Sequence, residues 1–315
     1  MSRYDIGPID LSALKTIRLA ERGGKVKVPD FARVYQRGSG VAGLIDTLPH
    51  ILAADTLRAV VDAVASAREK RKPVIWGIGG HVIKCGLAPV LIDLMRRGFA
   101  TAFAMNGSAS IHDFEIALAG HTSEDVEAVL PDGRFGVAEE TGRQWNSALQ
   151  AGTGAGEALG CALDRTASAQ FAVASLLLQA WRARVPVTVH VAIGTDTPHM
   201  HPAADPEALG AATHHDFRLF CSLVAALDDG GVYINAGSAV VMPEVFLKAV
   251  SCVRNLGHEL RNFTTVNLDF LQHYRPRVNV VERPLAQSGG RGYALTGHHE
   301  ILIPLIAAAL IERPA

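Results

Sequence analysis

The stretch VIWGIGGHVIKCGLAPVLIDLMRRG, residues 74–98, passes from a short apolar segment through Gly77, Gly79 and Gly80 into an amphipathic pattern. A strand that ends in glycines directly before a helix can form an anion site, because the backbone approaches closely and the helix offers free N–H groups. The spacing differs from the Gly-x-Gly-x-x-Gly pattern, whose third glycine would fall at Val82. The turn alone is therefore a weak signal, and the rest of the chain decides the fold.

The composition is that of a globular protein. The chain has 315 residues, of which 49% are hydrophobic, and a formal net charge of -1, so it can bury a large core. It shows no basic stripe, which argues against a nucleic-acid or membrane-surface partner. The longest apolar run, residues 301–311, is far shorter than the roughly 20 residues that span a bilayer. No signal peptide and no CxxC pair are apparent, so we expect a cytoplasmic protein with reduced thiols.

From residue 51 onward the hydrophobic pattern alternates between strands and helices. The expected strands are PVIWGIG (73–79), ATAFAMNG (100–107), PVTVHVAIG (186–194), GVYINAG (231–237), NFTTVNLDF (262–270) and a short RVNVV (277–281). The expected helices cover 57–70, 82–98, 110–120, about 139–160, 168–183, about 206–227, 243–257 and about 297–311. This succession predicts an α/β fold with a parallel sheet covered on both faces. Residues 1–50 are irregular and are expected to form an N-terminal arm, with 51–315 as one domain.

Polar residues gather where the predicted strands end. The stretches are GIGGH (77–81), MNGSASIHD (105–113), IGTDTPHMH (193–201), NAGSAV (235–240) and TTVNLD (264–269). Any one of them also fits ordinary turn chemistry. In an open α/β sheet, however, ligands bind beyond the carboxyl ends of the strands. Five such clusters at one edge therefore predict a ligand cleft there.

The order of these loops resembles the deoxyhypusine synthase-like NAD-binding family, which includes the NAD-dependent ornithine cyclodeaminase domain of arginine-degrading enzymes. The likeness to the cyclodeaminase lies in GIGGHVIKCG and AMNGSASIHDFEIALAG, and the likeness to the synthase lies in PVTVHVAIGTD, INAGSAVVMPEVFLKAV and TTVNLDF. It covers roughly residues 60–310. The resemblance implies a three-layer, Rossmann-like parallel sheet of the deoxyhypusine synthase-like NAD/FAD-binding type, NAD as the cofactor, and a homotetramer built as a dimer of dimers.

The resemblance also implies a set of residues around the cofactor. Gly79, Gly80 and His81 would lie near the phosphates, and Glu115 or Asp113 would lie near a ribose. A carboxylate at the ribose hydroxyls fits NAD rather than its 2′-phosphorylated form. The other residues implied near the cofactor are Asn106, Gly107, Asp196, Gly237, Ser238, Asn267 and Asp269.

The implied chemistry is transient hydride transfer on an amine-bearing small molecule, an amino acid or a polyamine, because NAD carries the redox step while the protein moves protons. His112 and Asp113 are the expected proton carriers, and Lys84 is a candidate base. Deoxyhypusine synthase needs a lysine that forms an imine, but the matching region LAQSGGRGYALTGHHE (285–300) contains none. We therefore expect an enzyme similar to the synthase that lacks its covalent amine transfer.

Two other functional classes remain open from the sequence. Asp196, His199 and His201 could bind a metal in a hydrolase or lyase, since His-x-His on an extended segment points both rings the same way. The main interpretation includes no metal. A nucleotide-binding module without catalysis is the other alternative, because a fold alone does not specify a reaction.

Overall fold

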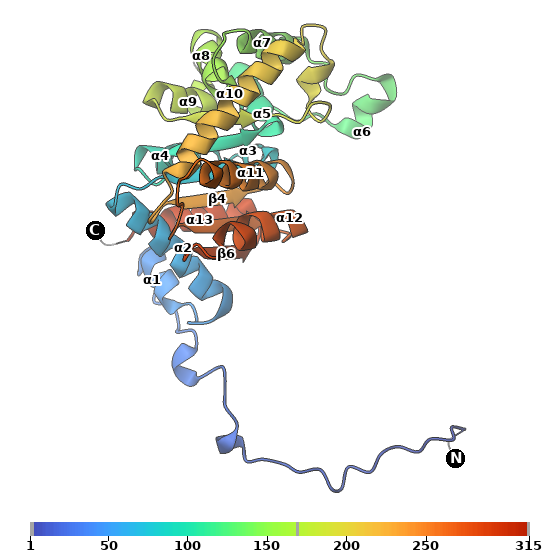
Figure 1. Ribbon diagram of the computed structural model, residues 1–315, viewed down its shortest axis with the longest axis vertical. Helices are drawn as coiled ribbons and strands as arrows, with labels where there is room; N and C mark the ends of the chain where they lie inside the picture. The colour runs from blue at the N-terminus through green and yellow to red at the C-terminus, as the bar shows by residue number, and fades with distance from the viewer. Residues whose placement is uncertain (1–2, 168–169, 314–315) are drawn as a thin grey trace.

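The computed structural model describes residues 3–167 and 170–313 and consists of a central sheet between two layers of helices (Figure 1). The strands are β1 (Val74–Ile78), β2 (Ala102–Asn106), β3 (Val187–His190), β4 (Val232–Ala236), β5 (Thr264–Asp269) and β6 (Arg291–Thr296). All neighbouring pairs are parallel, in the order β3-β2-β1-β4-β5-β6. This is the strand order of doubly wound Rossmann sheets. The predicted α/β, Rossmann-like fold class is confirmed.

Helices cover both faces of this sheet. They are α1 (Gly40–Thr47), α2 (Leu52–Glu69), α3 (Gly80–Lys84), α4 (Ala88–Arg96), α5 (Gly107–Ala119), α6 (Val126–Val129), α7 (Glu139–Leu149), α8 (Ala155–Thr166), α9 (Leu176–Ala183), α10 (Pro206–Ala225), α11 (Val241–Asn255), α12 (Tyr274–Pro276) and α13 (His299–Ile311). One core joins the sheet to α2, α4, α5, α9 and α13, and a second joins it to α11 and the end of α10. None of the described helices is both long and apolar enough to cross a membrane.

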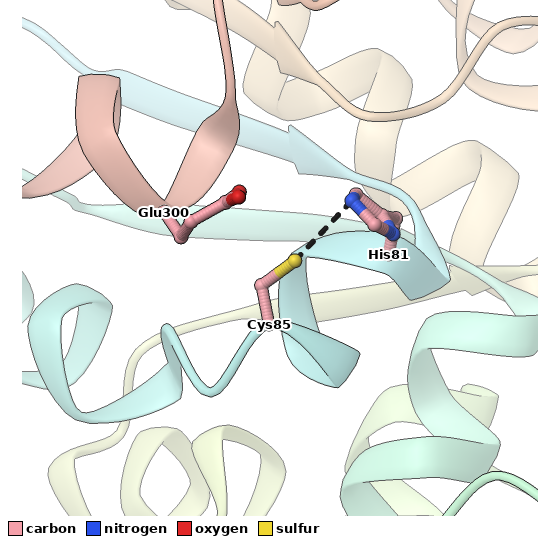
Figure 2. A group of neighbouring side chains, drawn as sticks. All are labelled: His81, Cys85 and Glu300. Carbon is pink, nitrogen blue, oxygen red and sulfur yellow. Dashed lines mark hydrogen bonds between the residues drawn. The ribbon is translucent and has the colours of Figure 1, made fainter.

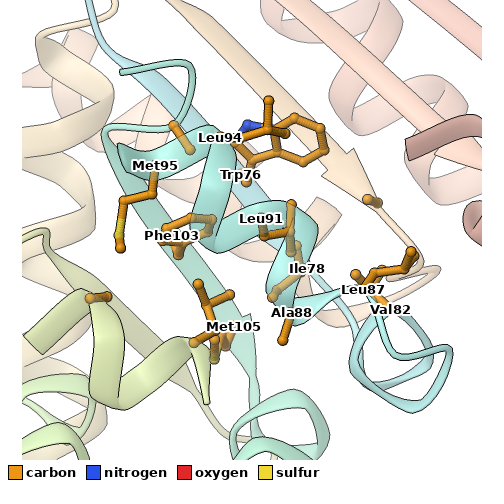
Figure 3. Packing of buried hydrophobic residues seen from close by; sticks show 14 of the residues in the cluster. Trp76, Ile78, Val82, Leu87, Ala88, Leu91, Leu94, Met95, Phe103 and Met105 are labelled. Carbon is orange, nitrogen blue, oxygen red and sulfur yellow. The ribbon is translucent and has the colours of Figure 1, made fainter. Parts of the chain in front are cut away.

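Alternation along the strands divides the side chains between these two cores. Trp76 and Ile78 of β1 belong to the first core with Phe103 of β2, and they pack there against α4 (Figure 3). Ile75 and Tyr233 point to the other face and belong to the second core. Successive residues of a strand face opposite sides of the sheet. Because a core lies on each side, the strands in the middle of the sheet are buried on both faces, and their sequences are continuous apolar runs.

The structure corrects the long helix predicted over residues 82–98. That segment forms two helices, α3 and α4, separated by Gly86, which has a left-handed φ of 75°. Pro89 lies in the first turn of α4, where its missing N–H costs no hydrogen bond. The amphipathic pattern continues from α3 into α4 without interruption, so the pattern does not indicate the turn between them. As a result α3 is a single short turn of helix at the edge of the sheet.

Two further predicted helices also differ from the structure. The helix expected over 139–160 is divided into α7 and α8 by a turn at residues 150–154. In the helix expected over 168–183, residues 168 and 169 lie outside the described part of the chain. There α9 begins at Leu176, where the Ser175 hydroxyl accepts the N–H of Leu178. A serine at that position is a typical helix N-cap.

The sequence assigned the last strand to the wrong segment. RVNVV, predicted as a strand, forms the π-helix η6 (Arg277–Glu282), and β6 comes later, at Arg291–Thr296. The cause is that β6 is an edge strand on which Leu295 is the buried residue, so it lacks an apolar run. Val278 and Val280 are buried in the helical conformation instead, and spacing of two residues does not exclude a helix in so short a segment.

Residues 3–29 extend away from the folded body with exposed side chains (Figure 1), whereas Asp30 and Arg33 hydrogen-bond to the backbone of His50 and Thr47. Short 3-10 turns at Leu19–Glu21 and Val28–Asp30 interrupt this segment. The helix α1 follows and contacts the end of the chain, where the backbone N–H of Ala42 donates to the Glu312 carboxylate at 2.7 Å. The domain boundary at residue 50 stays a prediction.

We expect Gly79→Ala to destabilise the fold by about 1–3 kcal/mol or more, the usual cost of overpacking. A Cβ at Gly79 would lie 2.0 Å from the backbone oxygen of Gly237, and neither backbone can move without disturbing the sheet. The matched control is Gly210→Ala inside α10, where a Cβ meets nothing within 4 Å, so it should stabilise the protein by roughly 0.5–1 kcal/mol. Urea denaturation of both variants checks the pair, and equal stabilities would contradict the close contact.

Candidate active site at the carboxyl edge of the sheet

The carboxyl ends of the parallel strands lie along one edge, which brings the five predicted polar loops to the same side of the sheet. From β1 the chain adds β2 and β3 on one side of the sheet, and from β4 it adds β5 and β6 on the other side. The point at which the strand order reverses, called the topological switch point, therefore lies between β1 and β4. Ligands of doubly wound sheets bind in the crevice at that point.

Glycines let four of these turns, those after β1, β2, β3 and β4, lie in contact with a neighbouring turn. The Gly79 N–H donates to the Ala236 oxygen at 2.9 Å, and Gly79 faces the Gly237 carbonyl across the switch point. A Cβ at Gly80 would lie 2.2 Å from the Ser108 hydroxyl, and one at Gly107 would lie 2.0 Å from the Asp196 carboxylate. From the sequence, these glycines are expected to let a cofactor approach the backbone closely. The structure shows that the missing side chains make room for neighbouring loops.

Backbone donors remain at the two turns that meet. The N–H groups of Gly80 and His81 after β1, and of Ser238 and Ala239 after β4, donate to no acceptor in the described part of the chain. Buried or ligand-facing N–H groups are normally paired. Such donors on both sides of a switch point suit a diphosphate.

Four of the predicted site residues, Lys84, His112, Glu115 and Asp196, line one cavity of about 190 Å³ beyond the carboxyl ends of β1, β2 and β3. Ser108 and Thr195 also contribute to its wall. A larger hollow of about 580 Å³ adjoins it and shares Glu115 in its lining. Residues from α3, α5 and the loop after β3 therefore converge, although they are distant in the sequence.

His112 is part of a hydrogen-bonded chain that ends at Glu115. Its Nδ1 lies 2.7 Å from the Thr122 hydroxyl, Thr122 donates to one Glu115 oxygen, and Thr141 donates to the other at 3.1 Å. Because the Thr122 proton is given to the carboxylate, His112 must be the donor to Thr122. This fixes the tautomer with hydrogen on Nδ1 and leaves a lone pair on Nε2. The sequence gave no signal for either threonine.

Burial, together with the positive charge of Lys84, lowers the pKa of His112 to about 4. The ring is therefore neutral at physiological pH and can accept a proton at Nε2. The chain through Thr122 to Glu115 orients the ring and stabilises the imidazolium that forms, as a carboxylate does in a catalytic triad. Lys84 itself is exposed at the mouth of the cavity.

Asp196 places a carboxylate in the same cavity. Its side chain is 9% exposed, and its Oδ2 is buried without a hydrogen-bond partner among the described residues. Burial raises the pKa of Asp196 to about 6, although a hydrogen bond with the backbone of Ala192 opposes the shift. A buried carboxylate oxygen without a donor is costly, so this position favours a cationic or hydrogen-bond-donating ligand.

Asp113 does not reach this cavity, which contradicts its predicted role in proton transfer. It is fully buried, accepts the Ser175 hydroxyl at 2.6 Å, and accepts the N–H groups of Leu176 and Leu177 at 2.7 and 2.9 Å. Burial raises the pKa of Asp113 to about 6 in spite of these bonds. Its function is structural, because it joins α5 to the N-terminus of α9.

The side chains of two residues that the resemblance places near the cofactor form hydrogen bonds within the protein. Asn267 is fully buried and bonds Asn235 and Gln272, both at 2.7 Å. The Ser238 hydroxyl accepts the N–H of Met242 at 3.1 Å. Both side chains are therefore satisfied within the protein, and the contacts with a cofactor that are predicted for Asn267 and for the backbone of Ser238 stay predictions.

Two further residues implied near the cofactor have local roles at the ends of their strands. The Asn106 side chain caps α5 by accepting the N–H of Ala109 at 2.9 Å. Asp269 is 4% exposed and accepts the N–H of Phe270 at 2.9 Å. These hydrogen bonds do not test whether Asn106 and Asp269 also contact a cofactor, so those contacts remain predictions.

The alternative metal site is contradicted. Residues Thr197–Met200 form a 3-10 helix, so the histidines do not lie on an extended segment. His201 Nε2 lies 3.0 Å from Glu139, while His199 Nδ1 accepts the N–H of Gly194 at 3.2 Å. Their ligand atoms do not form a cluster with Asp196. In the described ranges 3–167 and 170–313, the one group with suitable spacing is His81, Cys85 and Glu300.

Comparisons with known proteins show similarity in fold to several solved structures. No family model matches the chain, and no curated protein matches its sequence. An LOR/SDH-like protein from Methanococcus maripaludis S2 aligns at 15% identity over 83% of this chain and 70% of its own, with a TM-score of 0.51. A cysteine-to-alanine mutant of AgrE bound to L-arginine aligns at 13% identity over 83% of this chain, with a TM-score of 0.54.

AgrE has also been solved with ornithine and NAD+, and that structure aligns at 14% identity over 84% of this chain with a TM-score of 0.50. The chain spans 32–34% of the length of AgrE. At these identities the likeness concerns the fold. The predicted resemblance is thereby confirmed as a likeness in fold.

Proposed function

We propose that the protein is an NAD-dependent enzyme that acts on an amine-bearing small molecule, an amino acid or a polyamine, by transient hydride transfer. The observation that carries the proposal is the cavity beyond the carboxyl ends of β1, β2 and β3, whose lining includes the neutral His112 and also Asp196, a residue with one buried, unpartnered oxygen. The strand order and the free N–H groups of the two adjoining turns support a dinucleotide. AgrE, which shares the fold, binds ornithine and NAD+.

When bound, NAD would supply a reversible two-electron acceptor for the hydride of the amine-bearing carbon. The N–H groups of Gly80, His81, Ser238 and Ala239 would hold its diphosphate. Asp196 binds the ammonium group of the substrate and offsets its charge. The amine must lose a proton before the carbon gives up a hydride, and His112 Nε2 takes that proton. Glu115 stabilises the resulting imidazolium through Thr122.

The reaction does not include a covalent imine with a lysine of the synthase type. The region that would carry this lysine forms β6 and the start of α13, and the lysines after Lys72 are Lys84 and Lys248. Lys248 is exposed on α11 and pairs with Glu244. Lys84 lines the cavity mouth, where its charge raises the acidity of protonated His112.

The test is binding and turnover on the intact chain. A concentration of NAD a hundredfold above Kd should stabilise the protein by about 2.7 kcal/mol, a shift of several degrees in Tm, with a smaller shift for NADP. Ornithine, arginine, lysine, putrescine and spermidine, each incubated with NAD, should then yield a product by mass spectrometry for at least one substrate. His112→Gln should keep the NAD shift and lose about 100-fold or more in turnover.

The control for this variant is His258→Gln, because His258 is exposed and lies outside the cavity. It should change neither quantity. A protein that shows no thermal shift with either nucleotide would contradict the proposal. So would a His112→Gln variant with full turnover, since the proton then has another acceptor.

The Asp196→Asn variant should be more stable than the wild type at high pH and should bind the substrate less tightly. Raising the pKa of this carboxyl from its usual 3.8 to about 6 corresponds to about 3 kcal/mol. Because the folded pKa is raised, the stabilising contribution is complete below 3.8 and is lost as the pH rises through 6. Asparagine avoids this loss, so the variant should match the wild type near pH 4 and be more stable by up to about 3 kcal/mol at pH 8.

Substrate affinity should fall at the same time, because the amide cannot pair with an ammonium group. The exposed Asp229→Asn variant is the control and should alter neither property. Chemical denaturation at several pH values, together with kcat/KM, checks both parts. Unchanged kcat/KM in Asp196→Asn would remove Asp196 from substrate binding.

We also propose that the arm joins subunits into the expected homotetramer. Its exposed hydrophobic side chains have no place in the core of their own chain. They are Tyr4, Ile6, Ile9, Leu11, Leu14, Ile17, Leu19, Val26, Val28, Phe31, Val34 and Tyr35. Exposed apolar surface of this extent typically marks an interface. Deleting residues 1–27 should lower the molar mass measured by light scattering and leave the circular dichroism of the body unchanged. An unchanged mass would exclude the arm from assembly.

A further inference from the structure

A second group of reactive side chains lies near the switch point and is separate from the lining of the cavity. His81 and Cys85 lie one turn apart on α3, and Glu300 lies in the first turn of α13, pointing toward the Cys85 sulfur (Figure 2). One ligand atom from each residue lies within 4.8 Å of the other two. None of the three lines the cavity assigned to the substrate.

We propose that His81, Cys85 and Glu300 bind a zinc-type divalent cation. Imidazole, thiolate and carboxylate are all zinc ligands, and the thiolate discriminates against magnesium and calcium. The residues supply three ligands, and both His81 and Glu300 are exposed. A fourth position is therefore open to water or to a donor from a ligand, which is the arrangement of zinc sites that interact with substrates. Binding of the ion at this site requires no part of the proposed NAD chemistry.

The distances suit such an ion. The His81 Nε2 atom lies 3.2 Å from the Cys85 Sγ atom. Tetrahedral zinc with ordinary bond lengths separates a nitrogen and a sulfur ligand by about 3.6 Å. The Glu300 carboxylate has to close by roughly 1 Å to complete the set, and its exposed side chain is free to do so. It already lies near His298, whose Nδ1 is 3.8 Å from Glu300 Oε1.

Neighbouring rings hold His81 in place. Phe270 and His299 each contact it edge to face, with ring centroids 5.8 and 5.4 Å from that of His81. His299 is in turn fixed by the Leu268 carbonyl, 3.0 Å from its Nε2. Residues that orient a metal-binding histidine commonly contribute as much to affinity as a weak ligand does.

The free thiol is protonated under ordinary conditions. Burial, followed by the charge of Glu300, raises the pKa of Cys85. Binding therefore exchanges one proton for one cation: the S–H bond breaks, the proton goes to solvent, and the S–metal bond forms. No oxidant or reductant is needed. Without the cation, these three groups form a weak hydrogen-bonded cluster that leaves the thiol unreactive.

The experiment uses Co2+ as a spectroscopic probe and Zn2+ as its competitor, with the full-length protein and no nucleotide present. Wild type should bind one Co2+ per chain with a thiolate charge-transfer band in the near ultraviolet, and Zn2+ should remove that band. Mg2+ should produce no change. Cys85→Ser should abolish the band, and Glu300→Gln should weaken binding by about tenfold or more.

The matched control is Cys161→Ser, because Cys161 lies on α8, away from His81 and Glu300. It should bind Co2+ as the wild type does. Glu300 is exposed, so its variant keeps the test valid if Cys85→Ser does not fold. Wild type without the thiolate band, or Cys85→Ser with the band intact, would overturn the proposal. Failure of NAD to bind would leave this result unaffected, since no nucleotide is used.

Discussion

The backbone contact between Gly79 and Gly237 is the constraint on which the arrangement at this edge depends. It joins the turns after β1 and β4, the two strands from which the sheet grows in opposite directions. A side chain at Gly79 would separate the turns, because its Cβ would lie 2.0 Å from the Gly237 oxygen. With the turns in contact, the N–H groups of Gly80 and Ser238 lie on neighbouring turns at the switch point. A fixed set of donors costs a ligand little reorganisation, which is how preorganised sites gain affinity.

The same edge shows how buried carboxylates take different roles according to their partners. Asp113 accepts three hydrogen bonds at the start of α9 and has no oxygen left for a ligand. Asp196 is nearly as buried, but its Oδ2 has no donor among the described residues, and the residue contributes to the lining of a cavity. Burial raises the pKa of both carboxyls to about 6. The difference in satisfied hydrogen bonds, and not the pKa, indicates which of them serves a ligand.

Much of the sheet could be predicted from the sequence, because strands buried on both faces read as apolar runs. β6 could not, since its partly exposed residues give no such run. The site was predicted less well. On α5, His112 and Asp113 are adjacent in sequence but face opposite sides, and only the spacing of Asp113 from Ser110 and Ala117 places it on the buried face. Thr122 and Asp196 acquire their roles through distant partners, and no local pattern encodes such a contact.

α3 connects the two chemical environments of this edge. Within one turn of helix it presents Lys84 to the cavity, and His81 with Cys85 to α13. The turn is bounded by Gly80, which packs on Ser108, and by Gly86, which ends it with a left-handed φ. So short a helix has few internal hydrogen bonds, and most of its rigidity comes from its neighbours. A cation that linked His81 and Cys85 to Glu300 would therefore also fix the distance of Lys84 from His112. The pKa of His112 depends on that charge, so occupancy of the metal site and basicity in the cavity are physically linked.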